Sequence, residues 1–308
     1  IDYNVYEMIL GRPSLLHAKF RETEAYWQGR RDEVIADYKR DSIDLVRALD
    51  MDLIAVHPVA RAGYRPTPFE RLDDATYRDP ETGRLHQISS VTGDLMEMPV
   101  NTAYRRHATV EGLQAEIDAL RAAPELDPND SAYEVIRHAV AQLGQTHFVA
   151  ALINGLEWPR FGETEEESWM SLVQRPDICA KIAELQGVEM LREARLCARL
   201  GVDGIMAVGD HGSSSGLLAS PRIYRKMCYP WQKAQADEAR KHGLKVLRHC
   251  CGNVAPILNE LAEINDAWEA IQPTAGMDIG EIKRQVGDRL CLWGGIWHEH
   301  IHSGAPED

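Results

Sequence analysis

The chain has 308 residues, of which 44% are hydrophobic and 27% are charged. This composition is typical of a folded globular protein and does not favour disorder. The 48 Asp and Glu residues, against 34 Lys and Arg residues, give a formal net charge of -14. Such an acidic chain argues against nucleic acid and against an anionic membrane surface as partners.

The sequence contains no candidate membrane span or secretory signal. No run approaches the ~18 to 20 apolar residues that cross a bilayer, and no charged segment followed by an apolar one opens the chain. The six cysteines are spread without the dense spacing of a secreted disulfide scaffold. We therefore expect a cytoplasmic protein with reduced thiols. Because the first residue is Ile rather than Met, we also expect part of the natural N-terminus to be missing from this sequence.

The N-terminal third of the chain changes texture twice. Residues 22–49 place apolar residues at helical spacing among many charges, which predicts one or two amphipathic helices in an N-terminal helical segment over residues 1–50. The run "DLIAVHPV" (residues 52–59) then predicts a buried strand. Between residues 64 and 100, turn signals separate short β-prone pieces, which predicts an inserted antiparallel hairpin.

From residue 110 onward, helical segments alternate with apolar runs of strand length. We predict helices over residues 110–123, 131–143, 165–200, 221–242, 254–263 and 279–286. The strands are "FVAALIN" (148–154), "GIMAVGD" (204–210), "LKVLRHCC" (244–251), "AWEAIQP" (267–273) and "RLCLWGGI" (289–296). This alternation is the signature of parallel βα units.

Six parallel strands without a GxGxxG motif favour a (β/α)8 TIM-like barrel over a doubly wound sheet. We predict one barrel domain over residues 1–308. A closed barrel has eight strands, so the remaining strands need an explanation. Either one strand is hidden in the region before His147, or the sequence ends before the last βα units. We favour the second explanation, partly because the final "HSGAPED" resembles the start of a helix cap.

Functional residues of a parallel barrel lie at the carboxyl ends of its strands. These ends carry His57, Asn154, Asp210 with His211, His249 with Cys251, and Gln272. The candidate catalytic residues are Asp210 and His57, since a carboxylate at a strand end can orient a metal ligand or hold a substrate proton. The segment "GDHGSSSG" (209–216) could wrap an anionic group with backbone N–H donors, or it could be a plain flexible loop. The candidate cofactor-binding residues are Gly209, His211, Ser213 and Gln272.

The stretch "KVLRHCCGN" (245–253) ends one of these strands with a histidine and two cysteines. Side chains of a strand alternate between its faces, so His249 and Cys251 share a face and Cys250 points the other way. Imidazole nitrogen and thiolate sulfur are ligands that zinc selects, which makes His249 and Cys251 candidate metal ligands. The alternative is a core histidine with two buried, inert cysteines.

A zinc site with three protein ligands needs one more residue. Cys291 lies about four residues below its strand end, more than roughly 10 Å from the rim, so we expect it in the core. His298, His300 and His302 are nearer in height and alternate suitably, although loop histidines usually face solvent.

Five short motifs occur in an order and spacing that identify a family. They are Asp210 before the Gly/Ser loop, Ser220-Pro221, the H-x-C-G at His249, Cys251 and Gly252, the run Gly276-Met277-Asp278, and Gly294-Gly295. Together they resemble the uroporphyrinogen decarboxylase superfamily, in particular its zinc-containing, cobamide-dependent methyltransferases. The resemblance covers residues 201–308 well and the first half of the chain loosely.

The resemblance implies a (β/α)8 barrel and a zinc ion held by His249, Cys251 and a later cysteine, which we expect beyond Asp308. Zinc would bind the methyl acceptor and lower its pKa, which turns it into a nucleophile toward methyl-cobalt. The chain also departs from the decarboxylases. It lacks their Arg-rich N-terminal signature, it carries an H-x-C that they lack, and it has His57 where they have an aspartate. Where relatives have Gly-Gly-Ile-Asp, this chain has Trp297.

We therefore expect a methyltransferase that moves a methyl group between a corrinoid carrier, which can be a partner protein, and a small-molecule acceptor or donor, as in demethylation of methoxylated or methylated compounds. Two alternatives remain. One is a decarboxylase of a tetrapyrrole, which needs no metal. The other is a non-catalytic corrinoid or tetrapyrrole binder that kept the barrel and lost its chemistry.

Overall fold

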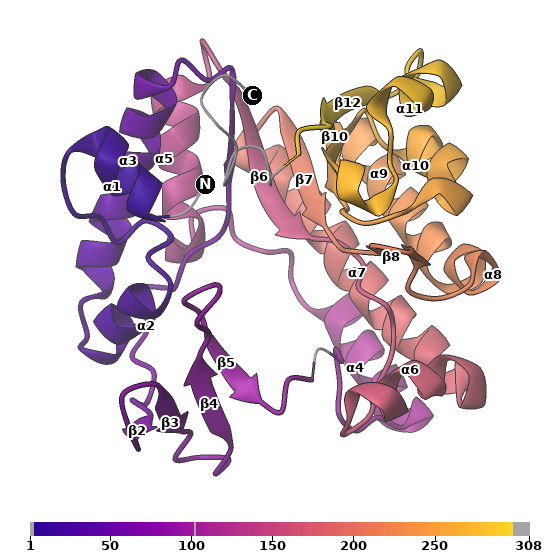
Figure 1. Ribbon diagram of the computed structural model, residues 1–308, viewed down its shortest axis with the longest axis horizontal. Helices are drawn as coiled ribbons and strands as arrows, with labels where there is room; N and C mark the ends of the chain where they lie inside the picture. Colours follow the sequence, from indigo (N-terminus) through magenta and orange to yellow (C-terminus); the bar gives the residue numbers. More distant parts are fainter. Residues whose placement is uncertain (1–2, 102, 298–308) are drawn as a thin grey trace. The chain divides into compact units, whose positions relative to one another are not determined.

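The structure is a computed structural model that describes residues 3–101 and 103–297 (Figure 1). The chain forms two compact units. Unit 1 comprises Ile1–Thr102 and Asp127–Val149, and unit 2 comprises Ala103–Leu126 and Ala150–Asp308. The prediction of one barrel domain over residues 1–308 stays a prediction. In the described ranges, no helix combines the length and the apolar character needed to cross a bilayer.

Unit 1 is a helical segment followed by a strand and an antiparallel insertion. Its helices are α1 (Tyr3–Leu10), α2 (Phe20–Trp27), α3 (Arg31–Ala48), the short η1 (Ser131–Tyr133) and α5 (Glu134–Leu143). Its strands are β1 (Leu53–Val56), β2 (Glu70–Arg71), β3 (Thr76–Arg78), β4 (Leu85–Ile88) and β5 (Leu95–Met98). The predicted helices over 22–49 and 131–143 are confirmed, and α1 is an addition. The insertion is antiparallel as predicted, but it forms a four-stranded sheet in the order β2-β3-β4-β5 rather than a single hairpin.

The helices of unit 1 are held together by a buried apolar stripe and by charge pairs. Val34, Ile35 and Val46 recur at helical spacing on one side of α3, and all three side chains are buried. The carboxylate of Glu134 in α5 pairs with Arg31 and, at 2.6 Å, with Lys39, both of α3. The two helices therefore pack with their apolar sides inward and their charges satisfied at the margin.

Unit 2 contains the alternating βα segments. Its helices are α4 (Val110–Ala122), α6 (Glu165–Gln174), α7 (Pro176–Leu200), α8 (Pro221–Ile223), α9 (Tyr229–Lys241), α10 (Leu258–Ile264) and α11 (Ile279–Val286), with short η2 (Tyr224–Cys228), η3 (Ala255–Ile257) and η4 (Pro273–Ala275). Its strands are β6 (Phe148–Asn154), whose first two residues belong to unit 1, β7 (Gly204–Val208), β8 (Gly212–Ser213), β9 (Gly216–Leu217), β10 (Lys245–His249), β11 (Ala267–Ile271) and β12 (Cys291–Gly294). Pro176 begins α7 directly after α6, so the helix predicted over 165–200 is two helices.

The main sheet has the strand order β1-β6-β7-β10-β11-β12. The pairs β6–β7, β7–β10, β10–β11 and β11–β12 are all parallel. In Figure 1, helices of unit 2 cover the outer face of this curved sheet. The structure thus confirms the predicted α/β fold class as part of a TIM-like barrel, and it places the carboxyl ends of β7, β10 and β11 at one edge.

The core of unit 2 lies between the sheet and its helices. Val246, Arg248 and Cys250 alternate along β10 and just beyond it, and all three side chains are fully buried. Trp268 on β11 is also fully buried, and its indole N–H donates to the Cys250 carbonyl at 2.9 Å. The face of β10 that carries Arg248 and Cys250 therefore belongs to the core.

The prediction that Cys291 lies in the core is wrong, because its side chain is exposed. The position of Cys291 along its strand predicts its distance from the rim, but it does not predict which elements cover the side chain. Cys291 starts β12, which comes last in the described strand order. Only Leu292 of that strand is partly buried, so this edge strand contributes little to the core.

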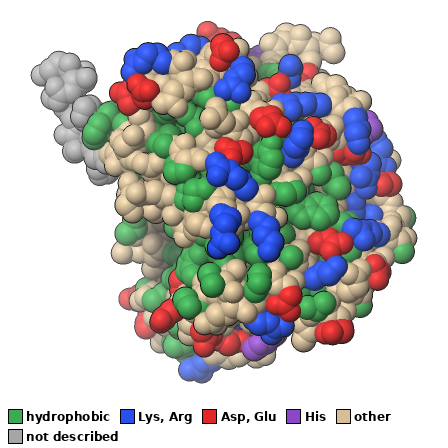
Figure 2. Space-filling view, turned by 90° about the vertical axis from the view of Figure 1, so that its right-hand side faces the viewer, with side chains coloured by type: hydrophobic (Ala, Val, Ile, Leu, Met, Phe, Trp, Pro, Cys, Tyr) green, Lys and Arg blue, Asp and Glu red, His purple; other side chains and the backbone are tan. Residues whose placement is uncertain are grey.

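The surface of unit 2 mixes charges of both signs. On the face in Figure 2, Lys and Arg side chains lie among Asp and Glu side chains and between hydrophobic ones. Many of these charges are paired, such as Lys241 with Glu238 at 3.0 Å and Arg121 with Glu184 at 2.9 Å.

Candidate metal centre

Three side chains of different chemistry converge at the carboxyl ends of β7 and β10. Asp210, His249 and Cys251 each offer one ligand atom, and these atoms all lie within 4.8 Å of one another. The register of the parallel pair explains this meeting, because His249 is opposite Val208 and Asp210 follows Val208 by two residues. An oxygen of Asp210 lies 3.7 Å from His249 Nε2 and accepts the Cys251 backbone N–H at 3.0 Å. The strand ends therefore present an oxygen, a nitrogen and a sulfur to one point.

The two adjacent cysteines have different surroundings, as the alternation predicted. β10 ends at His249, earlier than predicted, yet the chain beyond it still points Cys250 inward and leaves Cys251 half-buried at the site. The Cys250 sulfur accepts the backbone N–H of His211 at 3.4 Å, and burial raises the pKa of its thiol to about 12. Cys250 is consequently a neutral core side chain, whereas Cys251 is available as a ligand.

A carboxylate that the sequence reasoning missed orients the histidine. Glu269 of β11 lies opposite His249 in the parallel register and accepts a hydrogen bond from its Nδ1. With Nδ1 occupied, Nε2 is the nitrogen that faces Asp210. Hydrogen bonds to Cys251 and to Glu269 raise the pKa of His249 to about 10, so the imidazole is protonated on both nitrogens at neutral pH. The signal in the sequence was an acid inside the apolar run "AWEAIQP", but only the register shows what it faces.

The local charge favours a cation. Besides Asp210 and Glu269, Glu157 lies close by, and burial together with the negative charge of Asp210 raises the pKa of its carboxyl. Zinc–ligand bonds of ~2.0 to 2.3 Å in a tetrahedral site place the ligand atoms roughly 3.3 to 3.8 Å apart. The Asp210 oxygen and His249 Nε2 lie 3.7 Å apart, slightly more than the ~3.3 to 3.5 Å expected for an oxygen and a nitrogen ligand, so a small movement brings them to this spacing. Sulfur, nitrogen and oxygen donors in this arrangement fit a zinc ion.

The turn after Cys251 is held by two residues predicted to bind a cofactor. Gln272 Oε1 accepts the Gly252 N–H at 3.0 Å, and the Ser213 carbonyl accepts the Asn253 N–H at 2.7 Å. Gly252 has a φ of 76° and packs against the backbone of Gly212. Ser213 belongs to the small β8–β9 hairpin, so the segment "GDHGSSSG" is an ordered turn rather than a plain loop. The observed contacts of Gln272 and Ser213 are structural, and their role toward a cofactor stays a prediction.

The other predicted cofactor residues, Gly209 and His211, lie below the surface. Gly209 donates its N–H to the His249 carbonyl at 3.3 Å, which ties β7 to β10. His211 is fully buried, and its Nε2 lies 2.6 Å from Gln232 Nε2. Burial, with the nearby charge of Arg248, lowers the pKa of His211 to about 3. His211 is thus a neutral core side chain in this structure, and its predicted contact with a cofactor stays a prediction.

Four histidines remain among the candidates. His57 directly follows β1 in unit 1 and lines a pocket there, and its predicted catalytic role stays a prediction. His298, His300 and His302, considered as alternative zinc ligands, lie outside the described residues.

Comparison with known proteins agrees with the motifs. Residues 163–308 match the sequence model of the uroporphyrinogen decarboxylase (URO-D) family. This region belongs to the uroporphyrinogen decarboxylase superfamily. The match includes every motif from Asp210 to Gly294-Gly295, and so it confirms the resemblance at that level.

The fold has a solved relative. A methyltransferase from Methanosarcina mazei aligns with a TM-score of 0.52 and 14% sequence identity, over 94% of this chain and 80% of that chain. At this identity the likeness shows the fold alone. None of the curated proteins matches the chain in sequence.

Two superfamily motifs have structural roles that their hydrogen bonds explain. Asp278 caps α11 by accepting the Glu281 N–H at 2.7 Å, and Ser220 caps α8 in the same way through Ile223 at 3.3 Å. These motif residues start helices, whereas His249 and Cys251 lie together with Asp210 at the candidate site.

Proposed function

We propose that this protein is a zinc-dependent methyltransferase that moves a methyl group between a corrinoid carrier and a small-molecule acceptor or donor, as in demethylation of methoxylated or methylated compounds. The observation that carries this proposal is the convergence of Asp210, His249 and Cys251 within a region of the uroporphyrinogen decarboxylase superfamily. The fold shared with a methyltransferase supports it. We place the reaction in the cytosol, where thiols such as Cys251 stay reduced.

His249, Cys251 and Asp210 would hold the ion, with Asp210 in place of the later cysteine that the resemblance implies, and one position would be left open for a substrate group. Bound zinc supplies Lewis acidity, which lowers the pKa of a thiol or similar group at the open position and makes it a nucleophile. Glu269 keeps Nδ1 of His249 occupied, so Nε2 is the nitrogen that would bind the ion. The Cys251 backbone N–H fixes the Asp210 carboxylate beside it.

Proton balance at the site follows from the same contacts. A histidine ligates through a neutral nitrogen and a cysteine through its thiolate, so metal uptake releases protons. Without metal, His249 holds a proton on each nitrogen at neutral pH. Glu269 can accept the Nδ1 hydrogen bond in both states, and it therefore keeps the ring in place while Nε2 loses its proton.

Metal analysis tests the proposal. We expect the purified chain to bind about one zinc ion, and we expect Cys251→Ala and His249→Ala to lose it. Cys291→Ala is the matched control, because Cys291 is an exposed cysteine on another strand. Zinc binding that survives replacement of both His249 and Cys251 would refute the site.

An activity assay separates methyl transfer from the alternative functions. Zinc-loaded protein should transfer methyl from methylcobalamin to a simple thiol such as 2-mercaptoethanol, followed by the absorbance of the corrinoid. The same variants should lose this transfer, while Cys291→Ala keeps it. Transfer by the double variant at the rate of the unchanged chain would contradict the mechanism.

A second function has one observation in its favour. The family model that matches residues 163–308 is named for uroporphyrinogen decarboxylase. Decarboxylation of uroporphyrinogen by the metal-free chain would support this alternative over ours. Binding of a corrinoid or tetrapyrrole with no turnover of either kind would instead support a binder that lost its chemistry.

A further inference from the structure

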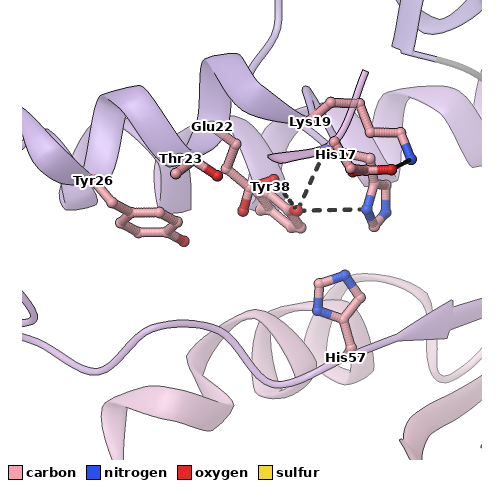
Figure 3. Close-up of a pocket in the computed structure, with 8 residues that line it drawn as sticks. His17, Lys19, Glu22, Thr23, Tyr26, Tyr38 and His57 are labelled. Carbon is pink, nitrogen blue, oxygen red and sulfur yellow. Dashed lines mark hydrogen bonds and ion pairs between the residues drawn. The ribbon is translucent and has the colours of Figure 1, made fainter. Parts of the chain in front are cut away.

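Unit 1 contains a pocket of its own, with a volume of about 350 Å³. Figure 3 shows the side chains of α2 and of the segment before it in a row, with His57 facing them from the end of β1. The lining residues are His17, Lys19, Glu22, Thr23, Tyr26, Tyr38, His57 and Asp94. All of them belong to unit 1. The volume lies at the lower end of the range for small-molecule sites, which is roughly 300 to 1,000 Å³.

A neutral donor holds the carboxyl group of Glu22 in this pocket. The Tyr38 hydroxyl donates to Glu22 Oε2 at 2.9 Å. Among the described residues, Glu22 has no ion-pair partner. The one lysine of the lining, Lys19, pairs with Asp94 at 3.3 Å. Burial raises the pKa of Glu22, which is the expected effect of a carboxylate that lacks a countercharge.

His17 does not supply the missing positive charge. His17 is largely buried beside His57 and Lys19, and these surroundings lower its pKa to about 4. It is therefore neutral at physiological pH. Lys19 is engaged with Asp94, so in the described part of the chain no positively charged side chain forms an ion pair with Glu22.

Aromatic rings lie beside the carboxyl group of Glu22. The ring centroids of His17, Tyr38 and His57 lie 5.0 to 5.6 Å from one another. Tyr26 adds a phenol ring on the other side of Glu22 in the row (Figure 3). The negative face of a phenol ring attracts a cation that lies within ~6 Å of its centre.

We propose that this pocket is a binding site for a small organic cation, an ammonium or quaternary ammonium group, with Glu22 as the countercharge and Tyr26, Tyr38 and His57 as the aromatic wall. A bound cation would give Glu22 an ion-pair partner, which no described side chain provides. An anion would instead meet an unpaired carboxylate in a partly desolvated site, at a cost in free energy. Binding at this site requires neither zinc nor a corrinoid. It can therefore be tested separately from the proposed methyl transfer.

Calorimetric titration of the full chain with choline and with its neutral isostere 3,3-dimethyl-1-butanol tests the proposal. The two probes have nearly the same shape and differ in charge. We expect choline to bind at least about tenfold more tightly than the isostere, and Glu22→Gln to weaken choline by about tenfold while it leaves the isostere unchanged. Glu24→Gln is the matched control, because Glu24 lies on the same helix, is exposed and does not line the pocket.

A second variant guards against misfolding of Glu22→Gln, which circular dichroism would reveal. Thr23→Lys places an ammonium group on the pocket wall and should abolish choline binding by occupying the site. Three results would overturn the proposal. They are equal affinity for choline and the isostere, unchanged choline binding in both pocket variants, and failure of choline to bind the unchanged chain. If the unchanged chain binds choline but no zinc, only the proposed methyl transfer is refuted.

Discussion

Glu269 lies directly opposite His249 across two parallel strands and accepts the hydrogen bond of its Nδ1. The two residues are 20 positions apart in sequence, and the register of β10 with β11 brings them together. Because both are on strands, the imidazole has little freedom to turn. Nε2 is thereby fixed on the side of Asp210, at 3.7 Å from its carboxylate.

The first prediction concerns this carboxylate. Glu269→Gln replaces a charged acceptor by a neutral amide, and changes of this kind lower metal affinity by about 10- to 100-fold. We expect that loss in a competition titration with a zinc chelator. Glu263→Gln, an exposed acid in the neighbouring α10, should leave the affinity unchanged. Equal affinities of the two variants would show that Glu269 does not support the ligand.

The second prediction separates the two cysteines. Cys250→Ala removes a fully buried sulfur that accepts a hydrogen bond, so we expect it to lower the free energy of unfolding by about 1 to 2 kcal/mol. It should keep the full zinc content, since its side chain lies in the core. Urea unfolding and metal analysis measure the two effects. Loss of zinc from folded Cys250→Ala would contradict the division of the pair.

The sequence predicted the pieces of the site better than their assembly. Strand alternation is local, so it correctly separated Cys250 from Cys251 although β10 ends at His249. Asp210 was named because it ends a strand, and the parallel register then brings it to His249. Helices and strands of the βα region were also predictable, because their apolar periods are long and regular.

The errors came from properties that depend on the whole fold. Glu269 was missed because an acid in an apolar strand says nothing about its cross-strand neighbour. Cys291 was expected in the core, yet burial depends on which elements cover a strand, and that strand is last in the described order. The partners of Glu22 were likewise invisible, since Tyr38 comes from another helix.

The third prediction uses a buried acid of α7. Burial raises the pKa of Glu193 to about 7, and one of its oxygens has no hydrogen-bond partner among the described residues. Between the pKa of the unfolded chain, about 4.3, and that of the folded protein, the folded state binds more protons. The free energy of unfolding therefore falls as the pH rises through this window, and the loss is complete above it.

Glu193→Gln removes this titration and keeps an acceptor for Asn154, which donates to Glu193 at 3.3 Å. At one pKa unit per 1.36 kcal/mol, we expect the variant to be more stable than the unchanged chain by about 1 to 3 kcal/mol at pH 8, and by much less at pH 5. Urea midpoints at both pH values measure the difference. The exposed Glu166→Gln should show no such dependence on pH, and a gain of equal size at both values would argue against a raised pKa.

The fourth prediction compares two glycines that share a backbone conformation and differ in their surroundings. Gly243 has a φ of 80°, and a Cβ added there would meet nothing within 4 Å, whereas at Gly252, with a φ of 76°, a Cβ would lie 2.5 Å from the Gly212 backbone. Gly243→Ala should cost only the strain of a left-handed residue, about 1 to 2 kcal/mol. Gly252→Ala should cost at least about 2 kcal/mol more, because two backbones must separate.

That separation would also move the turn that carries Cys251, so Gly252→Ala should bind zinc more weakly than Gly243→Ala even where both are folded. Unfolding midpoints and chelator competition on the two variants give the two differences. Equal losses of stability would mean that the chain relieves the contact elsewhere. Unequal stability with equal zinc affinity would mean that the turn at Gly252 supports the fold, while His249 and Asp210 fix the geometry of the site without it.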